Sequence, residues 1–433
     1  MTTVEERMLI MVDTTSNHNK FYHVILDDQG TVTKRWGRVG DTGQTATEHT
    51  GRNGFDRAIK AKTKKGYKET RIQNTGVTIK TGEHNLEDIA ASHLVNDTND
   101  TVLKTLIRRL VQMNRHQITE ASGGKITVND SGVIKTALGI VDQQAINEAR
   151  ALLNALQNRS QSITRTLEDY LTLIPQNIGR RAGWDTEFLN PTNLTNQKDF
   201  LNQLEASLQL ATTAAKAAAT DGGEAEDPNK HADLFRMRIG RLTDTDEFNR
   251  INALYKKTRL SAHSSARLDL KAVYTVEDIK GATAYQQAAT KYGNIKELWH
   301  GTKVDNVLSI LTKGLFVPNP GSGIQIAGRM FGDGVYFSDQ STKSLNYATG
   351  VWGGTRRTSD CFMLLNDVVM GHEFKPAYWN SDSLQKAHKG VGPSKKRYQS
   401  INVKGGTCGV RNNEMIVWNT DQISIRYLCE FGV

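Results

Sequence analysis

The chain has 433 residues, of which 37% are hydrophobic and 23% are charged, and its formal net charge is +9. This length exceeds what one compact core accommodates, so we expect two or three domains. No run of about 18 apolar residues and no basic, apolar leader is present, which excludes a membrane span and argues against secretion. Three scattered cysteines, Cys361, Cys408 and Cys429, fit neither a disulfide framework nor a zinc site. We therefore expect a globular protein of a reducing compartment, without a metal cofactor.

Positive charge is concentrated between Arg52 and Lys80. This stretch holds nine basic residues and two acidic ones, Asp56 and Glu69, so its net charge is +7. Such a density attracts polyanions, and the binding should weaken steeply as salt rises. The alternative is an ordinary solvated helix face.

The first segment, residues 1–83, has the pattern of a small β-rich domain. Phe21–Leu26 and Thr31–Trp36 have strand character, and Asp27–Gly30 between them has the composition of a turn. A helix that carries many of the basic residues is expected from about residue 55 to 65.

The second segment, residues 86–218, has helical periodicity and few strand signals. Apolar residues recur at helical spacing from Val102 to Val111, and further amphipathic runs span Ile134–Leu156 and Phe200–Leu210. Leu171–Pro175 breaks the pattern. We expect an all-α helical bundle.

The acidic stretch Thr220–Pro228 predicts a flexible linker over residues 219–231. The third segment, residues 232–433, alternates strands with short helices, which is typical of a mixed, mostly antiparallel α+β domain. Val304–Lys313 is predicted to be a helix that Gly314 ends. The ranges with strand character are Leu268–Tyr274, Glu297–His300, Met415–Trp418 and Ile423–Tyr427.

Three short motifs in the third segment each present one polar side chain from an apolar or glycine-rich stretch. They are Leu298–Thr302 with His300, Gly332–Phe337 with Tyr336, and Asn413–Val417 with Glu414. In this order the motifs resemble the His-Tyr-Glu signature of the poly(ADP-ribose) polymerase family. The resemblance implies an ADP-ribosyltransferase fold and an enzyme that consumes NAD and transfers ADP-ribose.

Trp36–Gly40, after the predicted hairpin and before the basic helix, resembles the WGR domain, a module that binds DNA ends beside such catalytic domains. The resemblance implies that Trp36 stacks on a sugar or base at a broken end and that Arg38 reaches the phosphate backbone. An aromatic ring supplies sequence-tolerant stacking, and a guanidinium group suits phosphate. Lys34 and Arg35 on the same strand are expected to bind DNA as well.

The resemblance also assigns the residues of an NAD site. Glu414 matches the catalytic Glu, His300 the His that bonds the adenosine-side ribose, and Tyr336 one wall of the nicotinamide pocket. Ser341–Tyr347 matches the Ser-Lys-Ser-x-Asn-Tyr stretch of the family. The other implied contacts are the Gly301 backbone and Ser344 with the carboxamide, Tyr347 with the nicotinamide ring, Lys343 beside the acceptor, and Thr302 and Asn306 near adenosine.

The chemistry of NAD explains why a carboxylate is needed. Cleavage of the bond between nicotinamide and ribose releases a neutral base and leaves oxocarbenium character on the sugar. A carboxylate near C1 stabilises this charge, as in glycosidases, and accepts a proton from the incoming hydroxyl. Each residue also has an ordinary explanation by itself: a half-buried His, a packed Tyr, an exposed Glu at a strand start. Their order and flanking residues favour the site.

Two departures from the family pattern bear on activity. Phe316 stands where many relatives carry an Arg near the adenosine end of NAD, which predicts weaker NAD binding. The stretch Gly371–Glu414, which borders the acceptor site in the family, is short, so chain elongation and target choice are open. It contains several basic residues: Lys386, Lys389, Lys395, Lys396 and Arg397.

Together these patterns predict an NAD-dependent poly(ADP-ribose) polymerase that DNA strand breaks activate and that modifies acidic or Ser side chains of proteins, including its own. The break at Tyr170–Pro175 resembles the helical regulatory domain that would block the NAD site at rest. The alternatives are a mono-ADP-ribosyltransferase, a DNA-end-binding scaffold with a silent transferase fold, and an NAD glycohydrolase. The expected location is the nucleus of a eukaryote, or the cytoplasm for a bacterial or viral protein.

Overall fold

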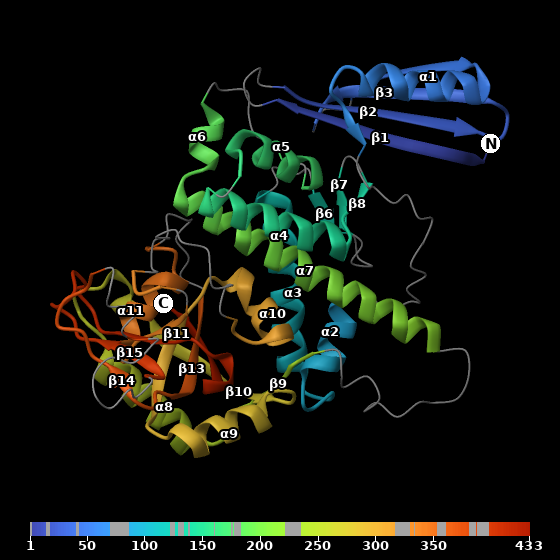
Figure 1. Cartoon of the computed structure of the whole chain (residues 1–433). Coiled ribbons are helices and arrows are strands. Elements are labelled where there is room, and N and C mark those ends of the chain that lie inside the picture. Colours follow the sequence, from blue (N-terminus) through green and yellow to red (C-terminus); the bar gives the residue numbers. More distant parts are fainter. Residues whose placement is uncertain are drawn as a thin grey trace. The chain divides into compact units, whose positions relative to one another are not determined.

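Figure 1 shows the computed structural model of the chain. It describes residues 2–13, 18–39, 43–69, 86–121, 126–128, 134–136, 139–159, 161–174, 176, 183–220, 235–316, 330–332, 334–352, 361–380, 387 and 398–433. Several residues that carry predictions lie outside these ranges: Gly40, Arg71, Lys80, Pro175, Asp333, most of the predicted linker from Asp221 onward, and the basic residues Lys386, Lys389, Lys395, Lys396 and Arg397.

The chain divides into two compact units. The N-terminal unit contains the described residues up to Leu86 and those between Asn114 and Thr220. The C-terminal unit contains Glu87–Met113 and the described residues from Phe235 onward. This division assigns parts of the predicted helical segment to both units, and the predicted domain boundaries stay a prediction.

An antiparallel sheet with the strand order β4-β3-β2-β1-β5 begins the N-terminal unit. Its strands are β1 (Thr3–Asp13), β2 (His18–Asp27), β3 (Thr31–Arg38), β4 (Gln44–His49) and β5 (Lys68–Glu69). The predicted hairpin is confirmed, since Leu26 pairs with Val32 across a turn in which Gly30 has φ of 78°. The sequence patterns did not reveal β1, β4 or β5.

Helix α1 (Gly51–Thr63) covers one face of this sheet and starts four residues before the predicted helix. It buries Phe55 against Leu9, Val24 and Val32. Arg52, Arg57 and Lys60 of α1 are exposed to solvent. Lys62 instead lies over the core rings of Tyr22 and Tyr67, at 4.4 and 5.2 Å from their centroids. An amphipathic helix thus presents the positive charge that the sequence concentrates here.

Among the described residues, four helices, the end of α3 (Thr101–Ala121) and a small sheet form the rest of the N-terminal unit. The helices are α4 (Gln143–Asn158), α5 (Ile163–Leu173), α6 (Trp184–Phe188) and α7 (Pro191–Thr220). The small sheet joins β6 (Ile126–Val128), β7 (Ile134–Thr136) and β8 (Gly139–Ile140). Strand β1 packs against α5, and Lys68 forms an ion pair with Asp169 at 2.5 Å.

The amphipathic run predicted from Ile134 to Leu156 is wrong in its first part. Ile134–Thr136 and Gly139–Ile140 are strands, and α4 begins only at Gln143. Asp142 fixes this start, because its carboxylate accepts a hydrogen bond from Ala145 N at 2.7 Å, which caps the helix. The expected all-α segment therefore contains a three-stranded sheet. The predicted linker also starts too early, since α7 extends to Thr220.

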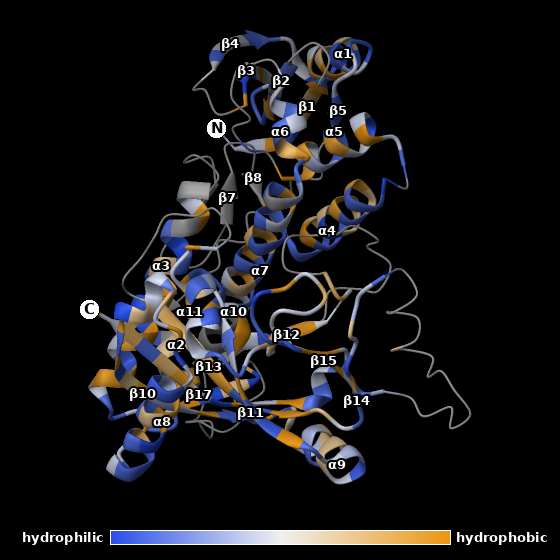
Figure 2. Cartoon of the chain, turned by 90° about the vertical axis from the view of Figure 1, so that its left-hand side faces the viewer, coloured by the Kyte–Doolittle hydropathy of each residue, from blue (hydrophilic) through white to orange (hydrophobic). Residues whose placement is uncertain are grey.

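The main sheet of the C-terminal unit is antiparallel, with the order β11-β13-β17-β10-β9. Its strands are β9 (Met237–Arg241), β10 (Asp269–Asp278), β11 (Ile295–Gly301), β13 (Cys361–Val369) and β17 (Ile423–Gly432). Hydrophobic residues line these strands in Figure 2. Among the described core clusters, the largest lies on one face of the sheet, around Trp299, Met363 and Phe431. The strands predicted from Leu268, Glu297 and Ile423 are confirmed.

Helices surround this sheet. They are α2 (Leu86–Leu94), α3 (Thr101–Ala121, whose first part belongs to this unit), α8 (Thr245–Thr258), α9 (Ala282–Tyr292), α10 (Val304–Lys313) and α11 (Ser341–Ala348). Two short 3-10 turns, Ser264–Arg267 and Thr420–Gln422, complete the set of described helical elements. Helix α10 has the predicted bounds, and Gly314 ends it with φ of 84°.

A second sheet has the order β12-β16-β15-β14. It contains β12 (Val335–Phe337), β14 (Glu373–Phe374), β15 (Ser400–Val403) and β16 (Glu414–Val417). Only β14 and β15 run parallel. The two sheets meet where Trp299 of β11 exchanges backbone hydrogen bonds with Ser338, at 2.9 and 3.0 Å.

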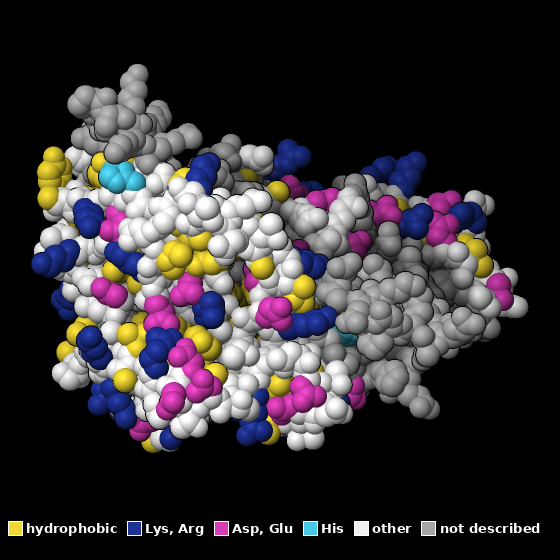
Figure 3. Space-filling model, turned by 90° about the horizontal axis from the view of Figure 1, so that it is seen from below, with side chains coloured by type: hydrophobic (Ala, Val, Ile, Leu, Met, Phe, Trp, Pro, Cys, Tyr) yellow, Lys and Arg dark blue, Asp and Glu magenta, His cyan; other side chains and the backbone are white. Residues whose placement is uncertain are grey.

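Charge is mixed on the face shown in Figure 3, where Lys and Arg side chains are interspersed with Asp and Glu. The exposed side of α1 differs, because this helix contains one acidic residue, Asp56, and four basic ones: Arg52, Arg57, Lys60 and Lys62. None of the helices within the described ranges has the length and apolar character that a membrane span requires.

We predict that Tyr255→Phe destabilises the C-terminal unit. The Tyr255 side chain is fully buried, and its hydroxyl donates a hydrogen bond to Leu268 O at 2.6 Å. Leaving that buried carbonyl without this donor should lower the free energy of unfolding by about 1–3 kcal/mol in urea titrations. Tyr378→Phe is the control, because Tyr378 is 69% exposed. Equal stability of both variants would contradict the prediction.

Candidate active site

The junction of the two sheets brings the first motif to the second. His300 and Gly301 end β11, immediately after Trp299, which pairs with Ser338 next to β12. The His300 Nδ1 atom lies 2.8 Å from Tyr336 O. The two motifs, separated by about 30 residues in the sequence, are therefore in direct contact.

His300 is a neutral acceptor in this setting. Burial, helped by the positive charge of Lys343, lowers the pKa of His300 to about 4, although the Tyr336 carbonyl acts in the opposite direction. A neutral imidazole whose Nδ1–H donates to Tyr336 O has a lone pair at Nε2. That atom can accept a hydrogen bond from a ligand hydroxyl.

Gly301 is required by the close approach of α11. A Cβ atom at this position would lie 1.7 Å from Ser344 O, which no side chain tolerates. The Ser344 hydroxyl donates to Trp299 O at 3.0 Å, so α11 is fixed against the end of β11. Because this hydroxyl hydrogen is used, the oxygen is left as an acceptor for a ligand N–H.

Glu414 begins β16 and forms an ion pair with Lys343 of α11, with 2.5 Å between Nζ and Oε2. The two side chains are 14% and 4% exposed, so this pair is largely shielded from water. Burial raises the pKa of Glu414 above its ordinary value, and the charge of Lys343 and its hydrogen bond act against this rise. Glu414 is therefore not the exposed residue that its position at a strand start suggests.

Two aromatic rings lie beside this ion pair. Tyr336 pairs with Ile416 across β12 and β16, and Glu414 is two residues from Ile416, so Tyr336 and Glu414 project from the same face of the sheet. The Tyr336 hydroxyl donates to Gly332 O at 2.7 Å. Lys343 Nζ lies 5.7 Å from the centroid of the Tyr347 ring.

Tyr347 is in turn supported by a residue that the sequence patterns did not reveal. Its ring meets the edge of Trp352, with the centroids 5.3 Å apart, and burial raises the pKa of Tyr347 to about 12. Trp352 also contacts His263, whose Nδ1 lies 3.0 Å from the Thr342 hydroxyl. No local motif marks Trp352 or His263, since both act through contacts distant in sequence.

Asn413 fixes the position of Glu414, and the sequence analysis assigned it no role. Its backbone O accepts from the Ser338 hydroxyl at 3.0 Å, and its backbone N donates to Gln340 Oε1 at 3.1 Å. The side-chain amide donates to Asp339 at 3.0 and 3.1 Å and accepts from Gly405 N at 2.8 Å. The position of Asn413 within the third motif, directly before Glu414, is the feature of the sequence that could have indicated this role.

Thr302 and Asn306 lie together at the start of α10. The Asn306 amide is 3.4 Å from the Thr302 hydroxyl. Asn306 Oδ1 is buried, and no described residue forms a hydrogen bond with it. Phe316, predicted to weaken NAD binding, is 46% exposed and beyond the end of α10. Among the residues with a described placement, no three His, Cys, Asp or Glu side chains could hold a metal ion.

The predicted DNA-binding residues form a separate cluster in the N-terminal unit. Trp36 and Arg38 line a cavity of about 590 Å³ together with Lys20, Gln44 and Tyr67. Lys34 projects from the same face of β3 as Trp36 and Arg38 and pairs with Glu48 at 2.5 Å.

Arg35 is the exception within this set. It projects from the opposite face of β3, where its guanidinium group lies 5.5 Å from the centroid of the Phe21 ring. The structure thus groups Trp36, Arg38 and Lys34 but separates Arg35 from them.

Comparisons with known proteins agree with this architecture. Residues 245–433 match the model of the poly(ADP-ribose) polymerase catalytic domain, and residues 5–74 match the model of the WGR domain. The chain belongs to the poly(ADP-ribose) polymerase family. It is accordingly an NAD⁺ ADP-ribosyltransferase, and NAD is its substrate.

Similar curated proteins cover nearly the whole chain. Poly [ADP-ribose] polymerase 2 of Zea mays is 27% identical over 95% of this chain and 68% of its own length. Protein mono-ADP-ribosyltransferase PARP3 of Mus musculus is 29% identical over 83% of this chain and 70% of its own length. Poly [ADP-ribose] polymerase 2 of Homo sapiens is 26% identical over 98% and 79%, respectively.

We predict that Lys343→Met shifts the acidic limb of the pH–rate profile toward higher pH. The variant leaves Glu414 in its buried position without the adjacent cation that favours its ionised form. The midpoint should rise by about 1–3 pH units, the usual effect of removing a close opposite charge. The measurement is the initial rate of ADP-ribose transfer from about pH 5 to pH 9.

Lys343→Arg is the matched control, because it keeps the positive charge and should keep the midpoint close to that of the wild type. A Lys343→Met enzyme that is slower at every pH with an unchanged midpoint would contradict an effect through the charge of Glu414.

Proposed function

We propose that this transferase is a poly(ADP-ribose) polymerase that binds DNA strand breaks through its N-terminal unit and is activated by them. The pairing of Glu414 with Lys343, beside His300 and Tyr336, is the observation that carries the catalytic part. Acceptors are acidic and Ser side chains of proteins, including its own. The main alternative function is the transfer of a single ADP-ribose group to each acceptor.

In this proposal the carboxamide of NAD bonds with the Gly301 backbone and with the Ser344 hydroxyl oxygen. The nicotinamide ring lies between Tyr347 and Tyr336. The ribose on the adenosine side donates a hydroxyl hydrogen to His300 Nε2, since the other ring nitrogen is already used on Tyr336 O. The contacts of Ser344 and His300 use atoms that their hydrogen bonds to Trp299 O and Tyr336 O leave available.

Asn306 supports the position of the adenosine end. Its Oδ1 is buried and has no hydrogen-bond partner among the described residues, and such atoms normally find one. A hydroxyl or amino hydrogen of NAD would supply the missing donor. Thr302, which lies 3.4 Å from the Asn306 amide, belongs to the same contact region.

Glu414 acts on the sugar and on the acceptor. The bond between C1 of the ribose and nicotinamide breaks, and its electron pair leaves with the neutral base. A hydroxyl acceptor forms a bond from its oxygen to C1 and loses its proton to the Glu414 carboxylate. An ionised acidic acceptor forms the same bond and has no proton to lose. The burial of Glu414 strengthens its attraction for the positive sugar carbon, because little water screens the charge.

Binding of DNA ends rests on the Trp36 cluster and the basic helix α1. Trp36, Arg38 and Lys34 share one face of β3, and α1 adds exposed Arg52, Arg57 and Lys60. A stacking ring with cations around it suits the exposed base and phosphates of a broken duplex.

The helices between the two motif regions are proposed to transmit DNA binding to the NAD site. Helix α3 contributes residues to both units, up to Met113 in one and from Asn114 in the other. Within the C-terminal unit, Arg109 of α3 forms an ion pair with Glu430 at 2.6 Å and lies 5.2 Å from the centroid of the Phe362 ring. Movement of α3 would therefore reach the transferase sheet directly.

The names of the relatives support both polymer formation and single transfer. The maize and human proteins are named poly(ADP-ribose) polymerases, and the mouse protein is named a mono-ADP-ribosyltransferase. The complete set of His300, Tyr336 and Glu414 favours polymer formation and argues against a silent scaffold.

We predict that labelled NAD modifies the purified protein when a blunt duplex with a 5′ phosphate is present. Glu414→Gln should lower the rate by about 10²–10³-fold, because the variant has no carboxylate to stabilise the sugar cation. Glu277→Gln is the control, since Glu277 is an exposed residue of β10 in the same unit.

The pattern of label distinguishes the alternatives. A DNA-dependent smear supports polymer formation, and a single sharp band indicates mono-ADP-ribosylation. Free ADP-ribose without labelled protein indicates a glycohydrolase. Intact NAD and an unlabelled lane would refute the enzyme and leave a DNA-end-binding scaffold.

We also predict that Trp36→Ala weakens binding to the same duplex by about tenfold to a hundredfold, the usual value of one stacking contact. Arg38→Ala should weaken binding and reduce the slope of log affinity against log salt by about 1. Arg35→Ala is the matched control, because Arg35 projects from the other face of β3. Fluorescence anisotropy at several salt concentrations measures these effects. An Arg35→Ala loss as large as that of Arg38→Ala would contradict the proposed binding face.

A further inference from the structure

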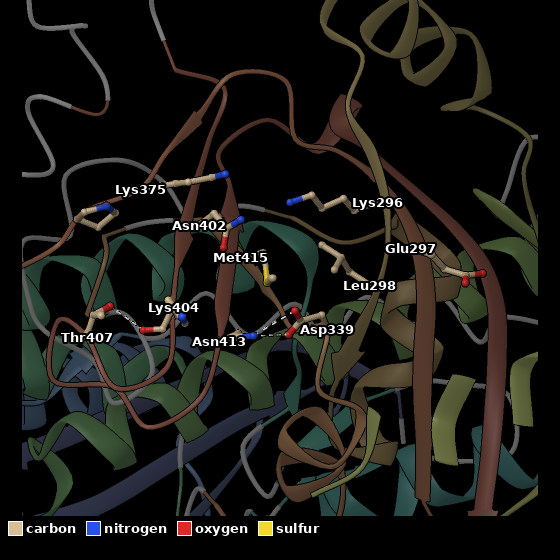
Figure 4. Close-up of a pocket in the computed structure, with 11 residues that line it drawn as sticks. Lys296, Glu297, Leu298, Asp339, Lys375, Asn402, Lys404, Thr407, Asn413 and Met415 are labelled. Carbon is tan, nitrogen blue, oxygen red and sulfur yellow. Dashed lines mark hydrogen bonds between the residues drawn. The ribbon is translucent and has the colours of Figure 1, made fainter. Parts of the chain in front are cut away.

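A second cavity of about 770 Å³ lies in the C-terminal unit, where β11 faces β15 and β16 (Figure 4). Its volume is in the range of small-molecule sites in proteins. None of the residues assigned to NAD lines it.

On β15 and β16, this cavity lies on the face opposite to Glu414. Asn402 and Met415 pair across β15 and β16, and the next pair along these strands is Val403 and Glu414. Successive residues of a strand project from opposite faces. Asn402 and Met415, which line the cavity, therefore face away from the side that carries Glu414.

One end of the cavity has an excess of positive charge. Lys296 and Lys375 point toward one another above Asn402 in Figure 4. Both lysines form ion pairs with the single carboxylate of Glu373, Lys375 at 3.1 Å. Lys404, which also lines the cavity, has no ion-pair partner within the described part of the chain. Lys404 lies at the other end of the cavity in Figure 4, beside Asn413. A lysine without a carboxylate partner suits an anionic group of a ligand.

The other end carries the carboxylate of Asp339. Each of its oxygens accepts a hydrogen bond from the Asn413 amide, at 3.0 and 3.1 Å. A carboxylate offers about four acceptor positions, so others remain for ligand hydroxyls. Neighbouring hydroxyls of a ribose commonly bond to one carboxylate in this way.

Apolar side chains separate the two polar ends. In Figure 4, Leu298 and Met415 lie between Asp339 and the two lysines Lys296 and Lys375. Pro376 adds to the lining. A flat ring packs well on such a surface, and a methionine sulfur contacts aromatic rings favourably. Cations, apolar floor and carboxylate thus occur in one cavity.

We propose that this cavity is a second binding site and that it takes a nucleoside phosphate. The phosphate lies against Lys404, the ribose hydroxyls bond to Asp339, and the base rests on Leu298 and Met415, toward Lys296 and Lys375. The site is additional to the NAD site proposed above. Two sources supply this chemistry around an ADP-ribosyltransferase: free ADP-ribose, and ADP-ribose attached to a modified protein.

The test is the stoichiometry of ADP-ribose binding to the whole chain, measured by isothermal titration calorimetry. We expect two sites per chain. Lys404→Glu should weaken one of them by about tenfold or more, since a charge-assisted contact is replaced by repulsion. Lys271→Glu is the matched control, because Lys271 is an exposed lysine of β10 outside the cavity, and both sites should persist. His300→Ala should weaken only the other site.

Further ligands define the chemistry. AMP and ribose 5-phosphate should compete for the Lys404-dependent site, and adenosine, which has no phosphate, should bind it at least about tenfold more weakly. Peptides carrying one ADP-ribose group distinguish the attached source from free ADP-ribose.

A single site per chain, or a second site that Lys404→Glu leaves unchanged, would overturn the proposal. Lys404→Glu should keep normal NAD turnover, because Lys404 is exposed and lies on the other side of the sheet from Glu414. The experiments distinguish a failure of the second-site proposal from a failure of the proposed function. An inactive protein with two ADP-ribose sites would refute the proposed function and leave the second site in place.

Discussion

Two backbone hydrogen bonds between Trp299 and Ser338 join the edges of the two sheets in the C-terminal unit. His300 follows Trp299 on one strand, and Tyr336 precedes Ser338 on the other, so the same junction brings both residues together. The Ser338 hydroxyl then bonds to Asn413 O, directly before Glu414. A displacement of this junction by one residue would move the His, Tyr and Glu apart, because side chains alternate along each strand.

Burial determines the charge of the groups at this junction. It keeps His300 neutral with a pKa of about 4 and raises the pKa of Glu414. An isolated carboxylate would tend to take up a proton in such surroundings, and Lys343 provides the countercharge that opposes this. A substrate whose sugar becomes positive can replace part of that countercharge in the transition state. The low exposure of the pair therefore serves catalysis more than stability.

The motif residues could be predicted from the sequence, because each lies in a short stretch with a recognisable neighbourhood. The hairpin of residues 21–36 and helix α10 were predictable for a similar reason, since periodicity and a terminal glycine are local features. The strand β7 was not, because Ile134–Thr136 is too short to show a period and is apolar enough to continue a helical pattern.

Contacts between distant residues account for the rest of what the sequence did not show. Trp352 packs against Tyr347, and His263 packs against Trp352, and no sequence motif includes these residues together. Side chains alternate between the two faces of β3, so Arg35 projects opposite to Trp36. The sequence did not show which of the two faces the cavity; the structure shows that Trp36 does. Pairings of this kind depend on the register of strands and the packing of helices, which composition does not specify.

The short strand β16 connects the two binding regions of the C-terminal unit. Glu414 projects toward Lys343 on one face, and Met415 lines the second cavity on the other. Asn413 is common to both, because its backbone positions the start of the strand and its amide bonds to Asp339 in the cavity. A ligand that donates hydrogen bonds to Asp339 shares this carboxylate with the Asn413 amide. Occupation of the cavity would therefore act on the residue that fixes Glu414, without any contact with NAD.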